Sequence, residues 1–166
     1  MKIHPEDAAI VEQDLLADGP VHSPGFWLWH ATMRWQREVA AALAPYDLTH
    51  PQFVLLSCAW WLNEQGKTPN QQELSQQAGT DVRTTSQVVR KLEAKGLLTR
   101  TTDPDDTRSL RLRITSQGVG LARAAIPDVE AADRSFFAPA AFPGPGRPAM
   151  DGVALSRLLR HLVDAP

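Results

Sequence analysis

Hydrogen-bonding and cationic side chains gather on one side of the segment from residue 83 to residue 91. This side offers guanidinium, ammonium, hydroxyl and carboxamide groups and no carboxylate, from Arg83, Thr84, Ser86, Gln87, Arg90 and Lys91. Phosphate oxygens accept hydrogen bonds from Arg, Lys, Ser and Thr, and base edges pair with bidentate Arg or Gln. The pattern suits a helix that lies in a DNA major groove, and an ordinary solvated helix face is the alternative.

A strand-like alternation follows about twenty residues later. Leu110, Leu112 and Ile114 alternate with Arg111 and Arg113, which is the two-residue period of a strand with one buried face. We expect the two arginines to project together, and we count Arg111 among the DNA-binding residues.

The segment before this strand, residues 103–109, has the composition of a turn, with three Asp residues and Pro104. Asp106 lies two residues before Arg108 and can hold its guanidinium in a fixed direction. A narrow, A/T-rich minor groove favours an inserted Arg. We therefore expect Arg108 to enter a minor groove, and a plain surface turn is the alternative.

Two short helices must position these groups. The first is expected to begin at residues 68–71, because Thr68 and Gln71 have capping-box spacing and Pro69 would take the first helical position. Gly79 is suited to end that helix in a left-handed conformation.

The second helix is expected to begin after Asp81, a favourable N-cap, and to end at Gly96. Its apolar spacing predicts a single buried stripe that contains Thr85, Val88, Val89 and Leu92. We also count Thr85 among the DNA-binding residues.

Four stretches of this sequence resemble the MarR family of bacterial transcription regulators: residues 72–74, residues 92–97, residues 103–109 and Ile114-Thr115. The similarity covers roughly residues 24–137. It implies a mainly α fold with a small β-hairpin wing, in which dimerisation helices flank a winged helix-turn-helix. Such regulators bind pseudo-palindromic double-stranded DNA as homodimers. Many members carry a basic residue at the position of Gln87 and an acidic one at Arg90, so the resemblance implies no particular operator sequence.

The resemblance and the helix patterns together divide the chain. Residues 1–23 are an acidic arm or tail, 24–48 an N-terminal dimerisation helix and 49–115 the winged helix-turn-helix DNA-binding domain. Residues 116–166 hold C-terminal dimerisation helices with a Pro/Gly-rich connection at 138–150.

The helices outside the DNA-binding domain have apolar surfaces to cover. Residues 26–43 are apolar on two sides, which predicts contacts with two partners. A long helix should follow a cap at Thr115 and bend at Pro127. A last helix should run from Asp151, its cap, to Val163 and pack on the partner subunit through Val153, Leu155, Leu158, Leu159 and Leu162.

Composition and charge agree with a regulator. The 166 residues are 43% hydrophobic and 22% charged with net charge −2, unlike a disordered or membrane chain. Residues 81–113 contain eight Lys or Arg and five Asp or Glu, whereas the remainder is acidic. The longest apolar run, residues 53–62, is too short to cross a bilayer. With one Cys and no signal-peptide pattern, we expect a cytoplasmic protein.

Aromatic residues raise the question of a ligand. Tryptophans at helical spacing could line a cavity for a small aromatic or phenolic effector, and we name Trp29, His30, Met33, Arg34 and Trp60 as its candidates. Ordinary core or dimer packing is the alternative.

Enzyme and metal motifs are absent from the sequence, so we expect no catalytic residues, cofactor or metal. Gly118-Val119-Gly120 has Arg123 where a dinucleotide fingerprint needs its third glycine, and we interpret it as a tight strand-to-helix junction. Cys58 lacks a neighbouring cation, which favours an inert buried thiol over a redox sensor. A winged helix that binds RNA or protein is the alternative function.

Overall fold

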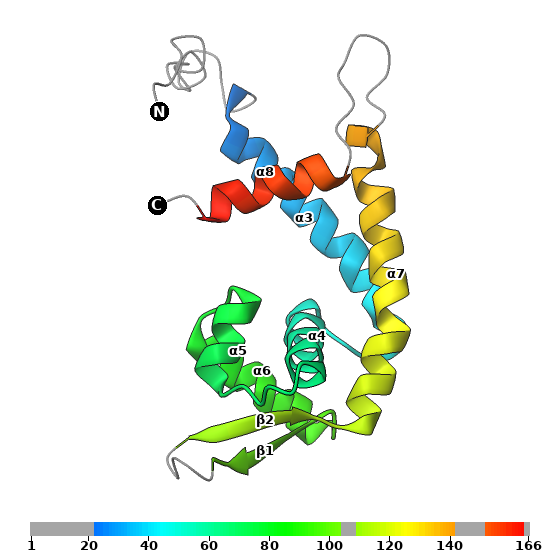
Figure 1. Ribbon diagram of the computed structural model, residues 1–166. Helices are drawn as coiled ribbons and strands as arrows, with labels where there is room; N and C mark the ends of the chain where they lie inside the picture. Colours follow the sequence, from blue (N-terminus) through cyan, green and yellow to red (C-terminus); the bar gives the residue numbers. More distant parts are fainter. Residues whose placement is uncertain (1–21, 104–108, 142–151, 165–166) are drawn as a thin grey trace. The chain divides into compact units, whose positions relative to one another are not determined.

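The computed structural model describes residues 22–103, 109–141 and 152–164. These residues form helices and one antiparallel hairpin (Figure 1). The elements are α3 (Pro24–Leu43), the 3-10 turn η2 (Ala44–Tyr46), α4 (His50–Glu64), α5 (Gln71–Ala78), α6 (Val82–Ala94), β1 (Leu98–Thr102), β2 (Leu110–Ile114), α7 (Ser116–Ala141) and α8 (Gly152–Asp164). Among the described residues, no helix combines the length and apolar character that crossing a bilayer requires.

The chain divides into two compact units, residues 1–37 and 38–166, so that α3 begins in the first and ends in the second. In the first unit, aromatic rings cluster at the start of α3. The ring centroid of Phe26 lies 5.4 Å from that of Trp27 and 4.3 Å from that of His30.

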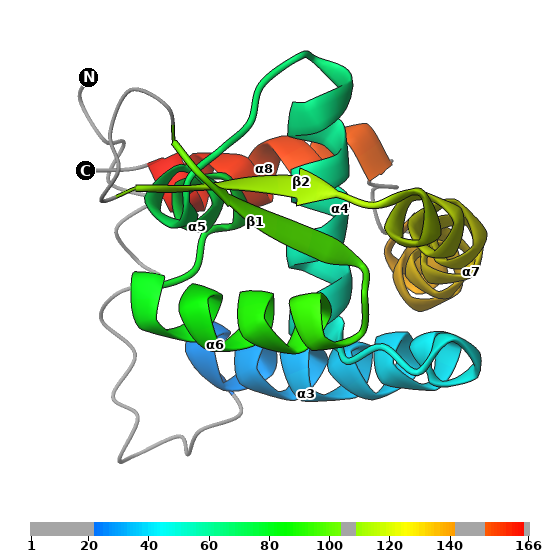
Figure 2. The same cartoon turned by 90° about the horizontal axis from the view of Figure 1, so that it is seen from below.

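The core of the second unit surrounds α4. This helix contacts α5, α6, β2 and α7, while α6 also packs along β1 (Figure 2). A capping box starts α4, because the Thr49 hydroxyl accepts from the Gln52 backbone and the Gln52 side chain accepts from the Thr49 backbone. The fully buried side chains include Leu55, Leu56, Leu74, Val89, Leu92, Leu97, Leu98 and Leu112. These apolar side chains pack α4, α5, α6 and the hairpin around one core.

Helix α5 starts later than the sequence predicted. Its N-cap is Asn70, whose side-chain oxygen accepts from the Glu73 backbone at 2.9 Å, while Glu73 Oε2 accepts from the Asn70 backbone at 2.8 Å. The prediction of a Thr68/Gln71 capping box was wrong, because Asn70 and Glu73, two residues later, form the capping box. Gly79 ends the helix with φ 64°, as predicted.

Helix α6 follows the prediction closely. The Asp81 carboxylate caps it by accepting from the Thr84 backbone at 2.8 Å, and Gly96 lies just beyond it with φ 70°. The predicted stripe of Thr85, Val88, Val89 and Leu92 is buried. The opposite side of the helix is consequently the side that faces solvent.

The hairpin pairs Leu98 with Ile114 and Arg100 with Leu112. Leu98 and Leu112 are buried, but Leu110 is 37% exposed, so the predicted apolar face covers only the part of β2 that lies over the core. After β2, the Thr115 hydroxyl caps α7 by accepting from the Gly118 backbone at 3.0 Å, which confirms the predicted start.

Gly118 makes the junction between hairpin and α7 possible. A Cβ at this position would lie 2.3 Å from the Leu97 carbonyl oxygen and 2.8 Å from Ile114 Cγ1. Glycine is therefore required by close approach of two backbones, as the sequence interpretation of a tight junction supposed. Gly120, two residues later, has open space around its Cα.

Helix α7 continues through Pro127 and Pro139 to Ala141, so it takes the first four residues of the predicted 138–150 connection. The bend expected at Pro127 stays a prediction. Tyr46 joins α7 to the turn between α3 and α4. Its hydroxyl donates to Asp128 Oδ2 at 2.6 Å, and the Ala124 carbonyl oxygen lies 2.8 Å from the same hydroxyl oxygen.

Helix α8 has the predicted length, and its expected cap Asp151 lies outside the described residues. Four members of its apolar stripe are exposed, namely Val153, Leu158, Leu159 and Leu162. Leu155 is half-buried.

Candidate nucleic-acid interface

The exposed side of α6 holds most of the side chains that the sequence suggested. Arg83, Gln87, Arg90 and Lys91 are exposed, and Ser86 is half-buried. Because Val88, Val89 and Leu92 anchor the opposite side in the core, α6 cannot rotate to hide these groups. Three cations and one carboxamide thus share a fixed, outward helix face.

Thr84 and Asp81 form a compact cap at the start of this face. Besides the backbone bond, the Thr84 hydroxyl donates to Asp81 Oδ2 at 2.6 Å. Hydrogen bonds from the Thr84 hydroxyl and then its backbone N–H lower the pKa of Asp81. The carboxylate is ionised at neutral pH, and its negative charge interacts favourably with the positive end of the α6 dipole.

Thr85 is placed differently from the other candidates. Its side chain is fully buried, and its hydroxyl lies 2.8 Å from that of Thr80. The sequence put Thr85 both in the buried stripe and among the DNA-binding residues, and the structure supports only the first. A buried hydroxyl with a partner cannot also contact a nucleic acid.

Two ion pairs hold the end of α6 and the residue after it. Arg100 on β1 pairs with Glu93 through its Nη2 atom. Lys95 Nζ lies 2.8 Å from Asp47 Oδ2, and it also donates to the Asp47 carbonyl. Asp47 has φ 51° in the turn before α4. These contacts tie α6 to the hairpin on one side and to the α3–α4 turn on the other.

The predicted minor-groove contact Arg108 and its partner Asp106 lie outside the described residues. The structure describes the two ends of that turn. Asp103 is only 3% exposed, and its backbone N–H donates to the Ser109 carbonyl at 2.9 Å. Asp103 and Ser109 are thus joined by a backbone hydrogen bond, with Asp103 buried and Ser109 half-buried.

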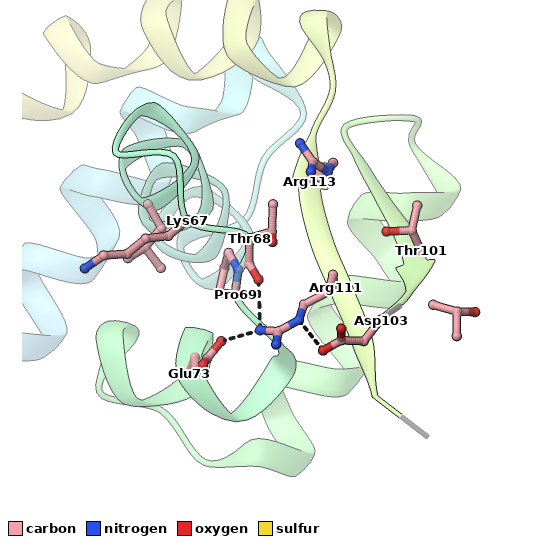
Figure 3. Close-up of a pocket in the computed structure, with 10 residues that line it drawn as sticks. Lys67, Thr68, Pro69, Glu73, Thr101, Asp103, Arg111 and Arg113 are labelled. Carbon is pink, nitrogen blue, oxygen red and sulfur yellow. Dashed lines mark hydrogen bonds and ion pairs between the residues drawn. The ribbon is translucent and has the colours of Figure 1, made fainter. Parts of the chain in front are cut away.

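Arg111 lies in a cluster of protein partners at the base of this turn (Figure 3). Its Nε donates to Asp103 Oδ2 at 2.6 Å, and its Nη1 lies 3.2 Å from the Thr68 carbonyl oxygen and 3.3 Å from Glu73 Oε2. The Arg113 side chain is exposed. Arg111 and Arg113 line the same cavity, as expected of alternate residues on one strand, but the Arg111 guanidinium is held by three protein acceptors.

A cavity of about 660 Å³ lies beside this cluster. Residues from the end of α4, the α4–α5 loop, α5 and both strands line it: Leu62, Lys67, Thr68, Pro69, Glu73, Thr101, Thr102, Asp103, Arg111 and Arg113. The wing and the first turn of α5 thus meet across polar side chains and open space.

Asn63 is a residue whose role sequence reasoning missed. Its side-chain oxygen accepts from the Ile114 backbone at 2.7 Å, and its Nδ2 donates to the carbonyls of Lys67 and Leu112. It fixes β2 to the end of α4. No local signal could have found it, since its partners on β2 are about fifty residues away in the sequence. The paired spacing of Asn70 and Glu73, by contrast, was available as a second capping box.

The five proposed ligand-pocket residues fall in both units. Trp29, His30 and Arg34 are exposed and Met33 is half-buried in the first unit. In the second, Trp60 donates through Nε1 to Glu64 Oε1 at 3.2 Å, and the Arg123 guanidinium lies 5.3 Å from its ring centroid. The pocket itself stays a prediction.

A second cavity, of about 500 Å³, lies between the end of α3, the start of α4 and Lys95. None of the five proposed ligand-pocket residues lines it or the larger cavity. His50 is in its wall, where burial lowers the pKa of the imidazole against the opposing effect of Asp133.

Cys58 is half-buried in α4, and burial raises the pKa of its thiol. Within the described ranges, His, Cys, Asp and Glu side chains do not gather in groups of three or more that could hold a metal ion.

A model of the MarR family matches residues 48–110 of this chain, which span α4, α5, α6 and β1 and end at the first residue of β2. The HTH-type transcriptional regulator YdcH of Bacillus subtilis is 46% identical over 122 residues, which are 74% of this chain and 83% of YdcH. The HTH-type transcriptional repressor Rv2887 of Mycobacterium tuberculosis is 33% identical over 124 residues, 75% of this chain and 84% of the repressor.

Solved structures have the same fold. BpsR of Bordetella bronchiseptica, whose DNA binding is regulated by 6-hydroxynicotinic acid, superposes with a TM-score of 0.73 and 28% identity over 87% of this chain and 95% of its own. The complex of Rv2887 with DNA superposes with a TM-score of 0.62 and 28% identity, over 84% and 97% of the two chains. The predicted mainly helical fold with a β-hairpin wing is confirmed.

Proposed function

The chain belongs to the MarR family of HTH transcriptional regulators, and from this premise we propose that it represses transcription by binding pseudo-palindromic DNA as a homodimer. The two α6 helices would lie in successive major grooves about 34 Å apart. Each Arg108 would enter a flanking minor groove, held by Asp106. A dimer bound over a promoter would block polymerase.

The exposed face of α6 is the observation that carries this proposal. We assign base reading to Arg83 and Gln87, whose side chains can form bidentate hydrogen bonds with guanine and adenine. We assign phosphate contacts to Arg90 and Lys91, with Thr84 and Ser86 as weaker hydroxyl contacts. Thr85 is left out of the interface because it is buried.

Dimerisation is supported by the apolar surface of α8. Leu158 and Leu162 are exposed in a single chain, and a helix with such a stripe needs a partner in water. We propose that residues 24–48 and 116–166 supply the subunit contact, while residues 49–115 bind DNA.

An effector forms the second part of the proposal. We propose that a small aromatic or phenolic effector weakens DNA binding, with the five residues named from the sequence as candidates for its contacts. The regulation of BpsR by 6-hydroxynicotinic acid supports this chemistry. Linkage requires that the effector lower DNA affinity by the same factor as DNA lowers effector affinity. Tryptophan fluorescence and DNA affinity measured with 6-hydroxynicotinic acid and a panel of phenols would test it.

Selection of bound duplexes from a random pool tests the proposed function directly. We expect symmetric sites whose half-sites are centred about 10 bp apart, with A/T-rich flanks where Arg108 enters. Selected sites without two-fold symmetry would contradict dimeric operator binding. Binding to RNA alone, with no duplex enriched, would favour the RNA-binding alternative.

A further inference from the structure

Arg111 joins three parts of the DNA-binding domain that are distant in sequence. Its guanidinium binds Asp103 directly after β1, the Thr68 carbonyl in the α4–α5 loop and Glu73 in the first turn of α5. The Asp103 side chain is 5% exposed and that of Arg111 is 31% exposed, so the shortest of these contacts is largely shielded from water. A shielded, charge-assisted hydrogen bond holds its geometry better than an exposed one.

The contacts of Arg111 lie in the outer half of the hairpin, away from the contacts that Asn63 makes. Asn63 fixes β2 at Leu112 and Ile114, close to α7. Farther out, the cavity of about 660 Å³ separates the wing from α5, and Leu110 leaves the core. Arg111 Nη1 reaches Glu73 in the first turn of α5, and the Leu112 backbone N–H donates to the Pro69 carbonyl in the loop before α5.

Glu73 gives this contact a connection to helix α5. The same Oε2 atom accepts from the Asn70 backbone in the capping box and from Arg111. The start of α5 and the wing therefore share one carboxylate.

We propose that Arg111 is a positioning residue that sets the direction of the wing relative to α5 and α6, and that it does not contact DNA. Asp103 is the last described residue before the segment that carries Arg108, and the contact with Arg111 holds its side chain. This role rests on the proposed function for its effect on DNA, but the contact can be tested on the free protein.

The substitution Asp103→Asn distinguishes a phosphate contact of Arg111 from a positioning role. The two roles predict changes in DNA affinity of opposite sign. If Arg111 contacted phosphate, Asp103→Asn would remove a competing negative charge and tighten DNA binding. If Arg111 positions the wing, Asp103→Asn and Arg111→Met must both weaken binding, because each breaks the same contact. Arg111→Lys keeps the charge but loses the planar fork, so it should behave like Arg111→Met.

The DNA experiment uses the full-length chain and a duplex that the wild type selects from a random pool. We expect Arg111→Met, Arg111→Lys and Asp103→Asn each to lower affinity on the order of tenfold, the scale of one missing base contact, and to lose base preference only in the flanks. The slope of log affinity against log salt should stay close to wild type. Arg113→Met, the neighbouring arginine on the same strand, is the matched control and should keep the flank preference.

Several outcomes would overturn the proposal. One is that Asp103→Asn tightens binding while Arg111→Met lowers the salt slope by about 0.9, the change expected when one phosphate is no longer neutralised, which would make Arg111 a DNA-binding residue. Another is that Arg111→Lys binds like wild type with intact flank preference, because then charge alone would suffice.

Hydrogen exchange on the free protein tests the positioning role without DNA. Arg111→Met should speed exchange at Leu112 N–H, which donates to the Pro69 carbonyl, and at Asp103 N–H, which donates to the Ser109 carbonyl. Ile114 N–H, bound by Asn63, should stay protected and shows that the variant is folded. Unchanged exchange at Leu112 and Asp103 would refute the positioning role, whether or not the wild type binds DNA.

Discussion

Single residues in the α6 face differ in what they can read. Gln87 and Arg83 are exposed and can form two hydrogen bonds with one base, whereas Lys91 is a point charge suited to phosphate. Thr84 is already bound to Asp81 through its hydroxyl. Base specificity should accordingly reside in fewer residues than the six that share the face.

We expect Gln87→Ala to change sequence preference at one position of each half-site. Removing a bidentate hydrogen-bond pair costs about 1–3 kcal/mol of discrimination between bases. Lys91→Ala should instead weaken binding to all duplexes to a similar degree and reduce the salt slope, since it would remove a phosphate contact. Comparing both variants on selected and unrelated duplexes measures the difference. A uniform loss of affinity for Gln87→Ala would reassign that residue to phosphate.

Cys58 provides a second expectation at this scale. Burial raises the pKa of its thiol, so at pH 7 to 8 less thiolate is present than in a free cysteine. Alkylation by iodoacetamide in the folded protein should therefore be slower than in the unfolded protein. Peroxide should leave DNA affinity unchanged in both wild type and Cys58→Ser. Loss of binding in the wild type alone would make Cys58 a sensor.

Sequence reasoning recovered residues whose roles depend on near neighbours. Asp81, Gly79 and Gly96 were identified because caps and helix ends involve contacts within a few residues. The contacts of Arg111 were not predicted because its partners Thr68 and Glu73 lie about forty residues away, and period-two alternation gives the face of a strand but not the partners of a long side chain.

At the scale of elements, local sequence patterns predicted several helices but misplaced the ends of two of them. The helices α3, α6, α7 and α8 were anticipated from apolar spacing and caps, whereas α5 was given a wrong start because two capping boxes overlap at residues 68–73. The end of α7 was also misplaced, since Pro139 lies within the helix and did not end it.

Gly118→Ala should destabilise the fold. Its methyl group would overlap the Leu97 carbonyl and Ile114, and relief requires moving the start of α7 away from Leu97, which lies between α6 and β1. We expect a loss of about 1–3 kcal/mol in the free energy of unfolding, typical of overpacking. Gly120 lies in the same helix with open space around it. Gly120→Ala should therefore raise the free energy of unfolding by about 0.5–1 kcal/mol. Urea denaturation of both variants decides, and equal effects would disprove the close approach.

At the scale of the whole molecule, the distribution of charge and apolar surface matters most. The chain has a net charge of −2, yet its proposed DNA-binding face collects cations. Binding should therefore be strongly salt-dependent although the protein is acidic, since affinity depends on local counterion release.

The exposed stripe of α8 yields an expectation about assembly. Leu158→Glu should shift the protein towards monomers, because a carboxylate in an apolar subunit contact would be buried without a partner. Affinity for a symmetric duplex should fall with it. Arg157→Glu makes a larger charge change on the same helix outside the leucine stripe and should leave the dimer intact. Analytical ultracentrifugation gives the masses, and a dimeric Leu158→Glu would remove α8 from the contact.

The hydroxyl contact of Tyr46 offers a built-in optical probe. Tyr46 is the chain's single tyrosine, and the hydrogen bond to Asp128 followed by the effect of burial and of the Asp128 charge raises its pKa. Phenolate absorbance in the ultraviolet therefore reports on a single contact, the one that Tyr46 makes between the α3–α4 turn and α7. Alkaline titration should show this phenol ionising above pH 10 in the native protein and near its ordinary value in denaturant. A ligand that loosened the joint would bring the native titration curve down towards the denatured one.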